Sequence, residues 1–217
     1  MSLTAIAILM LPLSQSASTD ILREEELRLA NCLERAINAP LEAYEDSLAW
    51  LSGGNRPRAR YCNAIALLAL EEYEEGAARL ESLANAPDAI AIGDRARFMA
   101  QAGNAWLTAN YPEAAITALS EALKLERDDP NLYKDRAAAY LALSRWVEGV
   151  DDLNSALALY PEDAESLRMR AKAHLETANY AAAQADIEES LSYNSTNLDT
   201  LVLRGEIREA IRLNGER

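Results

Sequence analysis

Apolar side chains recur along most of the chain with the spacing of one face of an α-helix. The segment 132–143 is typical, because its positions i, i+4, i+7 and i+8 are Tyr133, Ala137, Tyr140 and Leu141. This spacing predicts a helix whose apolar stripe packs on a neighbour. Arg136 falls inside the stripe. A charge at that place is costly unless it is paired or binds a ligand. Arg136 therefore has either a structural role, in an ion pair, or a functional role, in ligand binding.

The pattern returns every 34 residues. Rows that begin at residues 96, 130, 164 and 198 align without a gap. One column holds a small residue, namely Gly103, Ala137, Ala171 and Gly205. Three positions later stand Trp106, Tyr140, His174 and Arg208. The second half of each row has a small, a large and a small residue at i, i+4 and i+7: Ala115, Leu119 and Ala122; Gly149, Leu153 and Ala156; Ala183, Ile187 and Ser190. A repeat of this period indicates a stack of similar units.

Each row predicts a pair of antiparallel helices. The first helix has its small residue where a neighbouring helix must come close, and the second helix has an i, i+4, i+7 packing stripe. Asp129 followed by Pro130 is typical of an N-cap and a first helical position. The chain is also rich in Ala, Leu and Glu, with one Phe and eight Gly in 217 residues, which favours an all-helical protein.

With this period, the segments GNAWLTANYPEAAITALSEAL (103–123) and ANYAAAQADIEESL (178–191) resemble tetratricopeptide repeats. The resemblance is specific over residues 96–197 and weaker over 56–86. It implies an all-α fold, a right-handed superhelical solenoid of antiparallel helix pairs. It also implies that the first helices line the concave face of the solenoid.

The predicted organisation follows from this register. Residues 56–197 hold four repeat units, at 56–89, 96–129, 130–163 and 164–197, with a longer loop after the first of them. Residues 20–54 form a degenerate N-terminal helix pair. Residues 198–217 form a C-terminal capping helix, because Arg208 stands where an internal unit has an aromatic side chain.

The repeat register also changes the meaning of Arg136. Arg170 and Arg204 follow at 34-residue intervals, and Asp152 and Asp186 on the second helices are 34 residues apart as well. The sequence is similar to a variant of the repeat family that carries this Arg and Asp. The resemblance therefore implies a ladder of structural ion pairs formed by Arg136, Arg170, Arg204, Asp152 and Asp186.

The N-terminus has a different composition. The first 19 residues carry no charged side chain, and an apolar run from Leu3 to Leu13 precedes small residues. This resembles a secretory signal peptide over residues 1–17, cut near Ala17, although it lacks a Lys or Arg before the apolar run. The alternative is a first helix that docks on the domain. Eleven apolar residues are too few to span a bilayer, so no integral membrane span is expected.

Two cysteines, Cys32 and Cys62, fall on the first helices of neighbouring units. In an oxidising compartment they could form a disulfide. Two separate buried thiols are the more common fate of such residues. The sequence leaves both possibilities open.

Catalytic and metal-binding motifs are not found. The chain has no glycine-rich phosphate loop, no Gly-x-Ser-x-Gly and no His-Glu-x-x-His. Its acidic runs lack the ligand spacing of a calcium loop. His174 falls in the column of Trp106 and Tyr140 and is interpreted as a packed core residue. We therefore expect no enzyme, no cofactor and no bound metal.

Recognition of a polypeptide is the function that remains. The formal net charge of −14 argues against nucleic acid as a partner. Basic residues gather on the predicted first helices and acidic residues on the second. If the family geometry holds, this predicts a neutral-to-basic groove that suits an acidic peptide or a free C-terminus. The groove candidates are Arg97, Asn104, Lys134, Arg168 and Lys172.

The alternative to a peptide-binding groove is that these charged side chains form ion pairs between helices of the protein itself. Only fragments of the residue set that clamps a chaperone's C-terminal carboxylate are present (Asn104, Lys134 and Arg168), and Asp135 interrupts it. We expect the protein to act as a scaffold or adaptor that is located in the bacterial periplasm or secreted. The alternatives are a cytosolic adaptor or secretion chaperone, or a regulatory subunit of an enzyme complex. The partner and the oligomeric state are not predicted.

Overall fold

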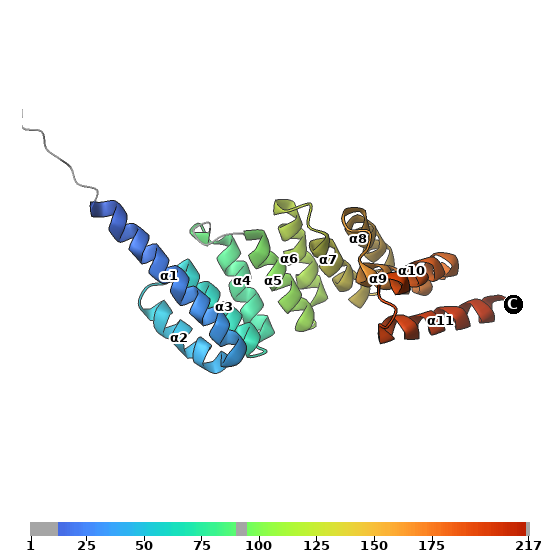
Figure 1. Cartoon of the computed structure of the whole chain (residues 1–217), viewed down its shortest axis with the longest axis horizontal. Coiled ribbons are helices and arrows are strands. Elements are labelled where there is room, and N and C mark those ends of the chain that lie inside the picture. Colours follow the sequence, from blue (N-terminus) through green and yellow to red (C-terminus); the bar gives the residue numbers. More distant parts are fainter. Residues whose placement is uncertain (1–12, 90–94, 216–217) are drawn as a thin grey trace, which may run out of the picture.

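The computed structural model describes residues 13–89 and 95–215, which contain eleven α-helices and no strand. The helices are α1 (Leu13–Asn38), α2 (Pro40–Ser52), α3 (Pro57–Ala69), α4 (Tyr73–Asn85), α5 (Arg95–Thr108), α6 (Pro112–Leu125), α7 (Pro130–Ala142), α8 (Trp146–Leu159), α9 (Ala164–Glu176), α10 (Tyr180–Tyr193) and α11 (Leu198–Gly215). They stack in chain order from α1 at one end to α11 at the other (Figure 1). The predicted all-α solenoid of helix pairs is confirmed.

The two sides of the stack differ. Among the first helices, α5 contacts α7, α7 contacts α9 and α9 contacts α11, and α1 contacts α3. Consecutive second helices, such as α6 and α8, make no contact of similar extent in the described residues. The first helices are therefore closer to one another, as expected for the inner, concave side of a curved array. We call the exposed side of α5, α7, α9 and α11 the inner surface.

The repeat columns form the core. Leu119, Leu153 and Ile187 of the second helices are fully buried, as are Ala137 and Ala171 of the first helices. At Gly103 the two helices of one unit come so close that an added Cβ would lie 2.5 Å from Leu119 Cγ. The small residue at Gly103 is thus needed for the close approach of α6.

A left-handed residue connects the two helices in each of the four pairs from α3–α4 to α9–α10. Glu71, Asn110, Ser144 and Ala178 have φ angles of 64°, 65°, 56° and 57°. The last three are 34 residues apart and occupy the same place in the repeat. Asn adopts this conformation readily, whereas Ala178 does so with strain, so the tight turn is imposed by the packing of the helices it joins.

The N-terminal pair is covalently attached to the array. Cys32 of α1 and Cys62 of α3 form a disulfide with a Cα–Cα distance of 5.9 Å. The structure therefore selects the disulfide over two separate buried thiols. Trp50 of α2 packs beside it, under the guanidinium of Arg28.

Helix α1 starts at Leu13 and so runs through the predicted cleavage point near Ala17. Most of the predicted signal peptide, residues 1–12, lies outside the described residues. No helix in the described part of the chain is long and apolar enough to cross a membrane.

Helix α11 ends the described array. Its residues Leu203 and Ile207 are buried against Ala183 and Ile187 of α10. Its Gly205 occupies the column of Gly103, but an added Cβ would meet no atom within 4 Å. The same position of the repeat is therefore tightly packed inside the stack, at Gly103, and unpacked in the last helix, at Gly205.

This contrast yields a test of the packing. We expect Gly103→Ala to destabilise the fold by about 1–3 kcal/mol, because Leu119 must move in a filled core. Gly205→Ala should instead stabilise it by up to about 1 kcal/mol through helix propensity. Chemical denaturation of the two variants measures both changes. Equal effects would show that Gly103 is not a contact point.

Candidate functional site

All five groove candidates lie on first helices. Arg97 and Asn104 are on α5, Lys134 is on α7, and Arg168 and Lys172 are on α9. Lys134 and Arg168 share one place in the 34-residue register, and Asn104 and Lys172 share another. Arg97 and Asn104 are seven residues apart and Arg168 and Lys172 four apart, spacings that put side chains on one face of a helix.

Three of these side chains connect neighbouring first helices. Asn104 Nδ2 donates to Asp135 Oδ2 of α7 at 2.8 Å. Lys134 Nζ donates at 3.0 Å to Oδ2 of Asp163, which is the N-cap of α9. Lys172 Nζ lies 3.7 Å from Glu206 Oε2 of α11. A chain of polar contacts thus runs across the inner surface from α5 to α11.

The cations of α7 and α9 are therefore neutralised within the protein. Arg168 pairs with Glu165 one turn earlier, and Lys172 also pairs with Glu176 at 2.8 Å. Hydrogen bonds to these two carboxylates raise the pKa values of Arg168 and Lys172. An acidic ligand at this place must compete with these carboxylates.

Asp163 and Asp135 show two different electrostatic environments. Burial acts to raise the pKa of Asp163, but hydrogen bonds from Ser166 and Lys134 outweigh it, and the pKa lies below its ordinary value. Burial dominates at Asp135 and raises its pKa, although Asn104 donates to it. Asp163 is thus held as an anion by its donors, whereas the charged form of Asp135 is less favoured.

Arg97 is exposed and differs from the other candidates. Its guanidinium lies 5.6 Å from the ring centre of Tyr61 and 5.5 Å from that of Phe98, a cation–π arrangement. It forms no ion pair with another described residue. It also borders a cavity of about 240 Å³ between α5 and the start of α7, lined by Ala96, Arg97, Ala100, Glu126, Asp129 and Leu132.

The arginines inside the apolar stripe form the ion pairs implied by the repeat. Arg136 Nε and Nη2 donate to the two carboxylate oxygens of Asp152, both at 2.7 Å. Arg170 binds Asp186 in the same way, at 2.8 and 2.7 Å. These carboxylates raise the pKa values of both arginines. Bidentate geometry of this kind fixes the relative position of two helices.

Each of these arginines also reaches a third helix. Arg136 Nη1 donates to Ser120 Oγ of α6 at 3.0 Å, and Arg170 Nη1 donates to Asn154 Oδ1 of α8 at 2.8 Å. The acceptor lies 16 residues before the arginine and the aspartate 16 residues after it. We call such a set of three side chains a triad. Sequence reasoning found the aspartates and missed the preceding acceptors, although the equal spacing was a usable signal.

The triad takes other forms elsewhere in the stack. Ser47, Asn63 and Arg79 occupy the same places in α2, α3 and α4, and buried Asn63 donates to Ser47 and accepts from Arg79. In α5 and α6 the places hold buried Ala102 and Ala118. The polar contact is therefore replaced by apolar packing in that unit.

Arg204 of α11 is the exception among the predicted pairs. It is half-buried and makes no ion pair with another described residue. No helix follows α11 among the described residues, so no second helix supplies the aspartate. Glu188, 16 residues earlier, instead accepts from Arg208 at 3.1 Å.

His174 lies beside the ladder. Its Nε2 is 3.8 Å from Asp186 Oδ2, and burial lowers its pKa in spite of that carboxylate. It occupies the column of Trp106 and Tyr140, which suits a packing role. No group of three or more His, Cys, Asp or Glu residues within 13–89 and 95–215 is arranged to hold a metal ion.

Comparison with known proteins bears on the fold. No protein-family model matches the sequence, and no curated protein matches it. Among solved structures, MamA of Desulfovibrio magneticus RS-1 is similar with a TM-score of 0.69 at 16% identity, covering 82% of this chain and 97% of that one. The Sgt2 tetratricopeptide domain of Aspergillus fumigatus has a TM-score of 0.55 at 18% identity, covering 58% and 84%.

The first tetratricopeptide domain of Spaghetti (RPAP3), solved with an HSP90 peptide SRMEEVD, has a TM-score of 0.53 at 22% identity, covering 54% of this chain and 93% of that one. At these identities the similarity concerns the fold. The chain thus has a tetratricopeptide-like fold, as its repeat motifs imply.

A double-mutant cycle tests the ladder. Arg136→Ala should strand the Asp152 carboxylate, so Arg136→Ala, Asp152→Ala and the double variant should reveal a coupling of about 1–3 kcal/mol in the free energy of unfolding. The exposed pair Arg145–Glu148 is the matched control, and its coupling should be too small to measure. Additive effects at Arg136 and Asp152 would contradict the ladder.

Proposed function

We propose that this protein is a non-enzymatic scaffold or adaptor that binds a polypeptide on the inner surface. The observation that carries the proposal is the chain of contacts from Asn104 to Glu206, which holds side chains of four first helices in fixed positions. A surface that is ordered before binding loses little conformational entropy when a partner is bound.

The known structures support the same kind of partner. The RPAP3 domain is bound to a peptide that ends in Glu-Glu-Val-Asp. An acidic peptide also suits Arg97, which lies exposed above Tyr61 and Phe98. We propose Arg97 and Asn104 as the centre of the binding surface and Arg168 and Lys172 as its extension.

Lys134 has a smaller part in this proposal than its sequence position suggests. Its side chain is only 25% exposed, and its partner Asp163 caps α9. Replacement of Lys134 would therefore disturb the fold together with the surface. The contribution of Lys134 is to hold α7 against α9.

We further propose that the chain is exported, to the bacterial periplasm or beyond. Support comes from the apolar run Leu3–Leu13 and from the Cys32–Cys62 disulfide, which suits an oxidising compartment. N-terminal sequencing of the protein from its own host tests this directly. A mature start near Ser18 is expected, and an intact Met1 would instead favour a cytosolic adaptor, a secretion chaperone or a regulatory subunit.

Partner capture tests the inner surface. The variant Arg97→Ala/Arg168→Ala should bind the polypeptides captured by the wild-type chain with about tenfold lower affinity, because it removes two cations from the proposed contact. Lys124→Ala/Arg127→Ala removes the same charge from exposed sites on and after α6 and should bind normally. Affinity purification from the native host, followed by mass spectrometry and titration, measures both. Equal loss in both variants would refute the proposed surface.

A further inference from the structure

Helix α11 leaves open a side that the complete units cover. In the units of α5 to α10 the second helix packs on the first along the column of Gly103, Ala137 and Ala171, and all three residues are buried. Gly205 of α11 stands in the same column but is exposed. No second helix follows α11 among the described residues, and α11 forms the end of the array (Figure 1). The side of α11 that a second helix would cover is therefore open.

This side, which we call the end face, is formed by Leu198, Leu201 and Gly205 at i, i+3 and i+7, with Arg204 at its edge. Leu198 is 75% exposed. The cap of a repeat array normally presents a polar outer face to solvent. On the end face the charged side chains begin only at Arg208. The first half of α11 thus keeps apolar side chains on a surface that a partner can cover.

Arg204 lacks the partner that its sister arginines have. Arg136 and Arg170 hold the same place in the repeat, and each donates two hydrogen bonds to a carboxylate of its own second helix, Asp152 or Asp186. Arg204 is half-buried and makes no ion pair with another described residue. Since a guanidinium is always charged and matches a carboxylate in shape, a carboxylate is the group that completes this part of the end face.

The second helices that supply these carboxylates share a sequence pattern. An Asp is followed directly by a large apolar residue and, three positions further, by a small one: Asp152, Leu153 and Ala156 in α8, and Asp186, Ile187 and Ser190 in α10. The large apolar residue is fully buried in both helices. Ser190 Oγ donates at 2.7 Å to the carbonyl oxygen of Ala164, whose place Leu198 holds in α11. A helix with this pattern therefore matches the end face from Arg204 to Leu198.

We propose that the end face binds an amphipathic helix of another polypeptide, which lies antiparallel to α11 and places an Asp on Arg204. The residue after this Asp is Leu or Ile, and an Ala or Ser follows three positions later. Gly205 allows this helix the close approach that Gly103 allows α6. The bound helix completes the last unit in the way that α10 completes the unit before it.

The charge of this side also favours an acidic helix. Arg204, Arg208 and Arg212 follow at four-residue intervals along α11, in a protein of net charge −14. Arg208 and Arg212 bind Glu188 and Glu209 in exposed pairs, which contribute little. These two arginines can therefore exchange partners when an acidic helix approaches, and their charge speeds its association.

A second copy of this chain does not offer the required helix. The pattern of Asp, then Leu or Ile, then Ala or Ser occurs in the sequence at Asp152 and Asp186 alone. Both of its helices are packed between neighbours, and Leu153 and Ile187 are fully buried. The occupant is thus another polypeptide. This inference goes beyond binding at the inner surface and does not depend on it, because it uses other residues.

A peptide with the sequence of residues 180–193, constrained as a helix by a lactam link between exposed positions, tests the proposal. Fluorescence anisotropy with the full-length chain should show saturable binding. Gly205→Leu should weaken it about tenfold or more, because the added side chain holds the two helices apart. This variant should fold, since an added Cβ at Gly205 would meet no atom within 4 Å. Arg204→Ala should weaken binding to a similar extent, because the Asp of the peptide loses its donor.

A mutant cycle shows whether Arg204 meets the Asp of the peptide. Replacement of Asp186 by Ala in the peptide should weaken binding about tenfold to the wild-type chain and less than about twofold to the Arg204→Ala chain. Ser192→Leu adds a leucine side chain at an exposed position of α10, and Arg127→Ala removes one arginine charge after α6. Both controls should bind as the wild type does, and circular dichroism should show that all variants are folded.

Absence of binding to the wild-type chain would overturn the proposal, as would unchanged binding by Gly205→Leu or additive effects in the cycle. Analytical ultracentrifugation of the chain alone tests the other occupant. A monomer is expected, whereas self-association that Gly205→Leu abolishes would assign the end face to a second copy and so overturn the proposed partner.

Discussion

Arg136 belongs to α7 and binds Asp152 of α8 and Ser120 of α6, so one guanidinium joins two helices of its own unit and one of the unit before. Arg170 repeats the arrangement one unit later. A helix pair with a 34-residue period has to stack on its neighbour in one particular register for the inner surface to form. Partly buried ion pairs add little net stability, but their bidentate geometry is satisfied by one arrangement of the helices. The placing of the inner-surface side chains therefore depends on these triads.

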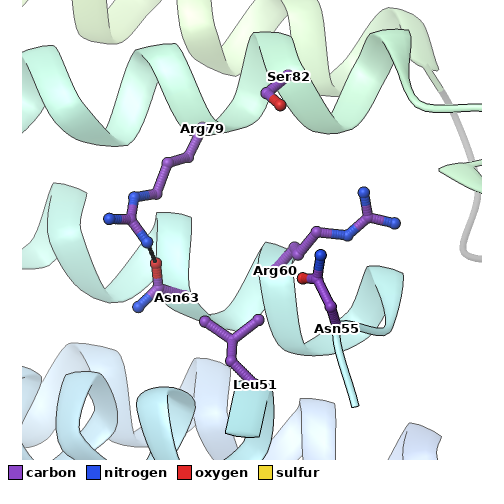
Figure 2. A pocket seen from close by; sticks show the side chains of 6 residues that line it. All are labelled: Leu51, Asn55, Arg60, Asn63, Arg79 and Ser82. Carbon is purple, nitrogen blue, oxygen red and sulfur yellow. Dashed lines mark hydrogen bonds between the residues drawn. The ribbon is translucent and has the colours of Figure 1, made fainter.

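The residues at the triad positions differ from one unit of the stack to the next. Where they are apolar, at Ala102 and Ala118, the close packing of Gly103 on Leu119 holds the unit together. In the unit of α3 and α4 the polarity is inverted, with Arg79 in the place of the aspartate. Arg60 and Arg79 of this unit both line a hollow of about 180 Å³ (Figure 2).

Much of this architecture was predictable. The 34-residue register predicted the all-α stack and the small-residue column, because these features repeat and rest on helix periodicity. The pairing of Arg136 and Arg170 with aspartates was implied by the resemblance to a variant of the repeat family. The disulfide could not be decided, since its geometry depends on how α1 packs on α3. The ion pairs of Lys134 and Lys172 could not be predicted either, because they depend on side chains of the next unit, Asp163 and Glu206.

The triads fix the stacking of units more than they stabilise the fold. Spin labels can be attached at two exposed positions, Lys124→Cys on α6 and Ser192→Cys on α10. Pulsed electron paramagnetic resonance then measures the distance between the labels, which reports how the units stack. The comparison is between the parent chain and one whose triad is made apolar by Ser120→Ala, Arg136→Met and Asp152→Leu. We expect the apolar triad to leave the free energy of unfolding unchanged to within about 1–2 kcal/mol and to broaden the distance distribution between the labels. A distribution as narrow as that of the parent chain would contradict this expectation.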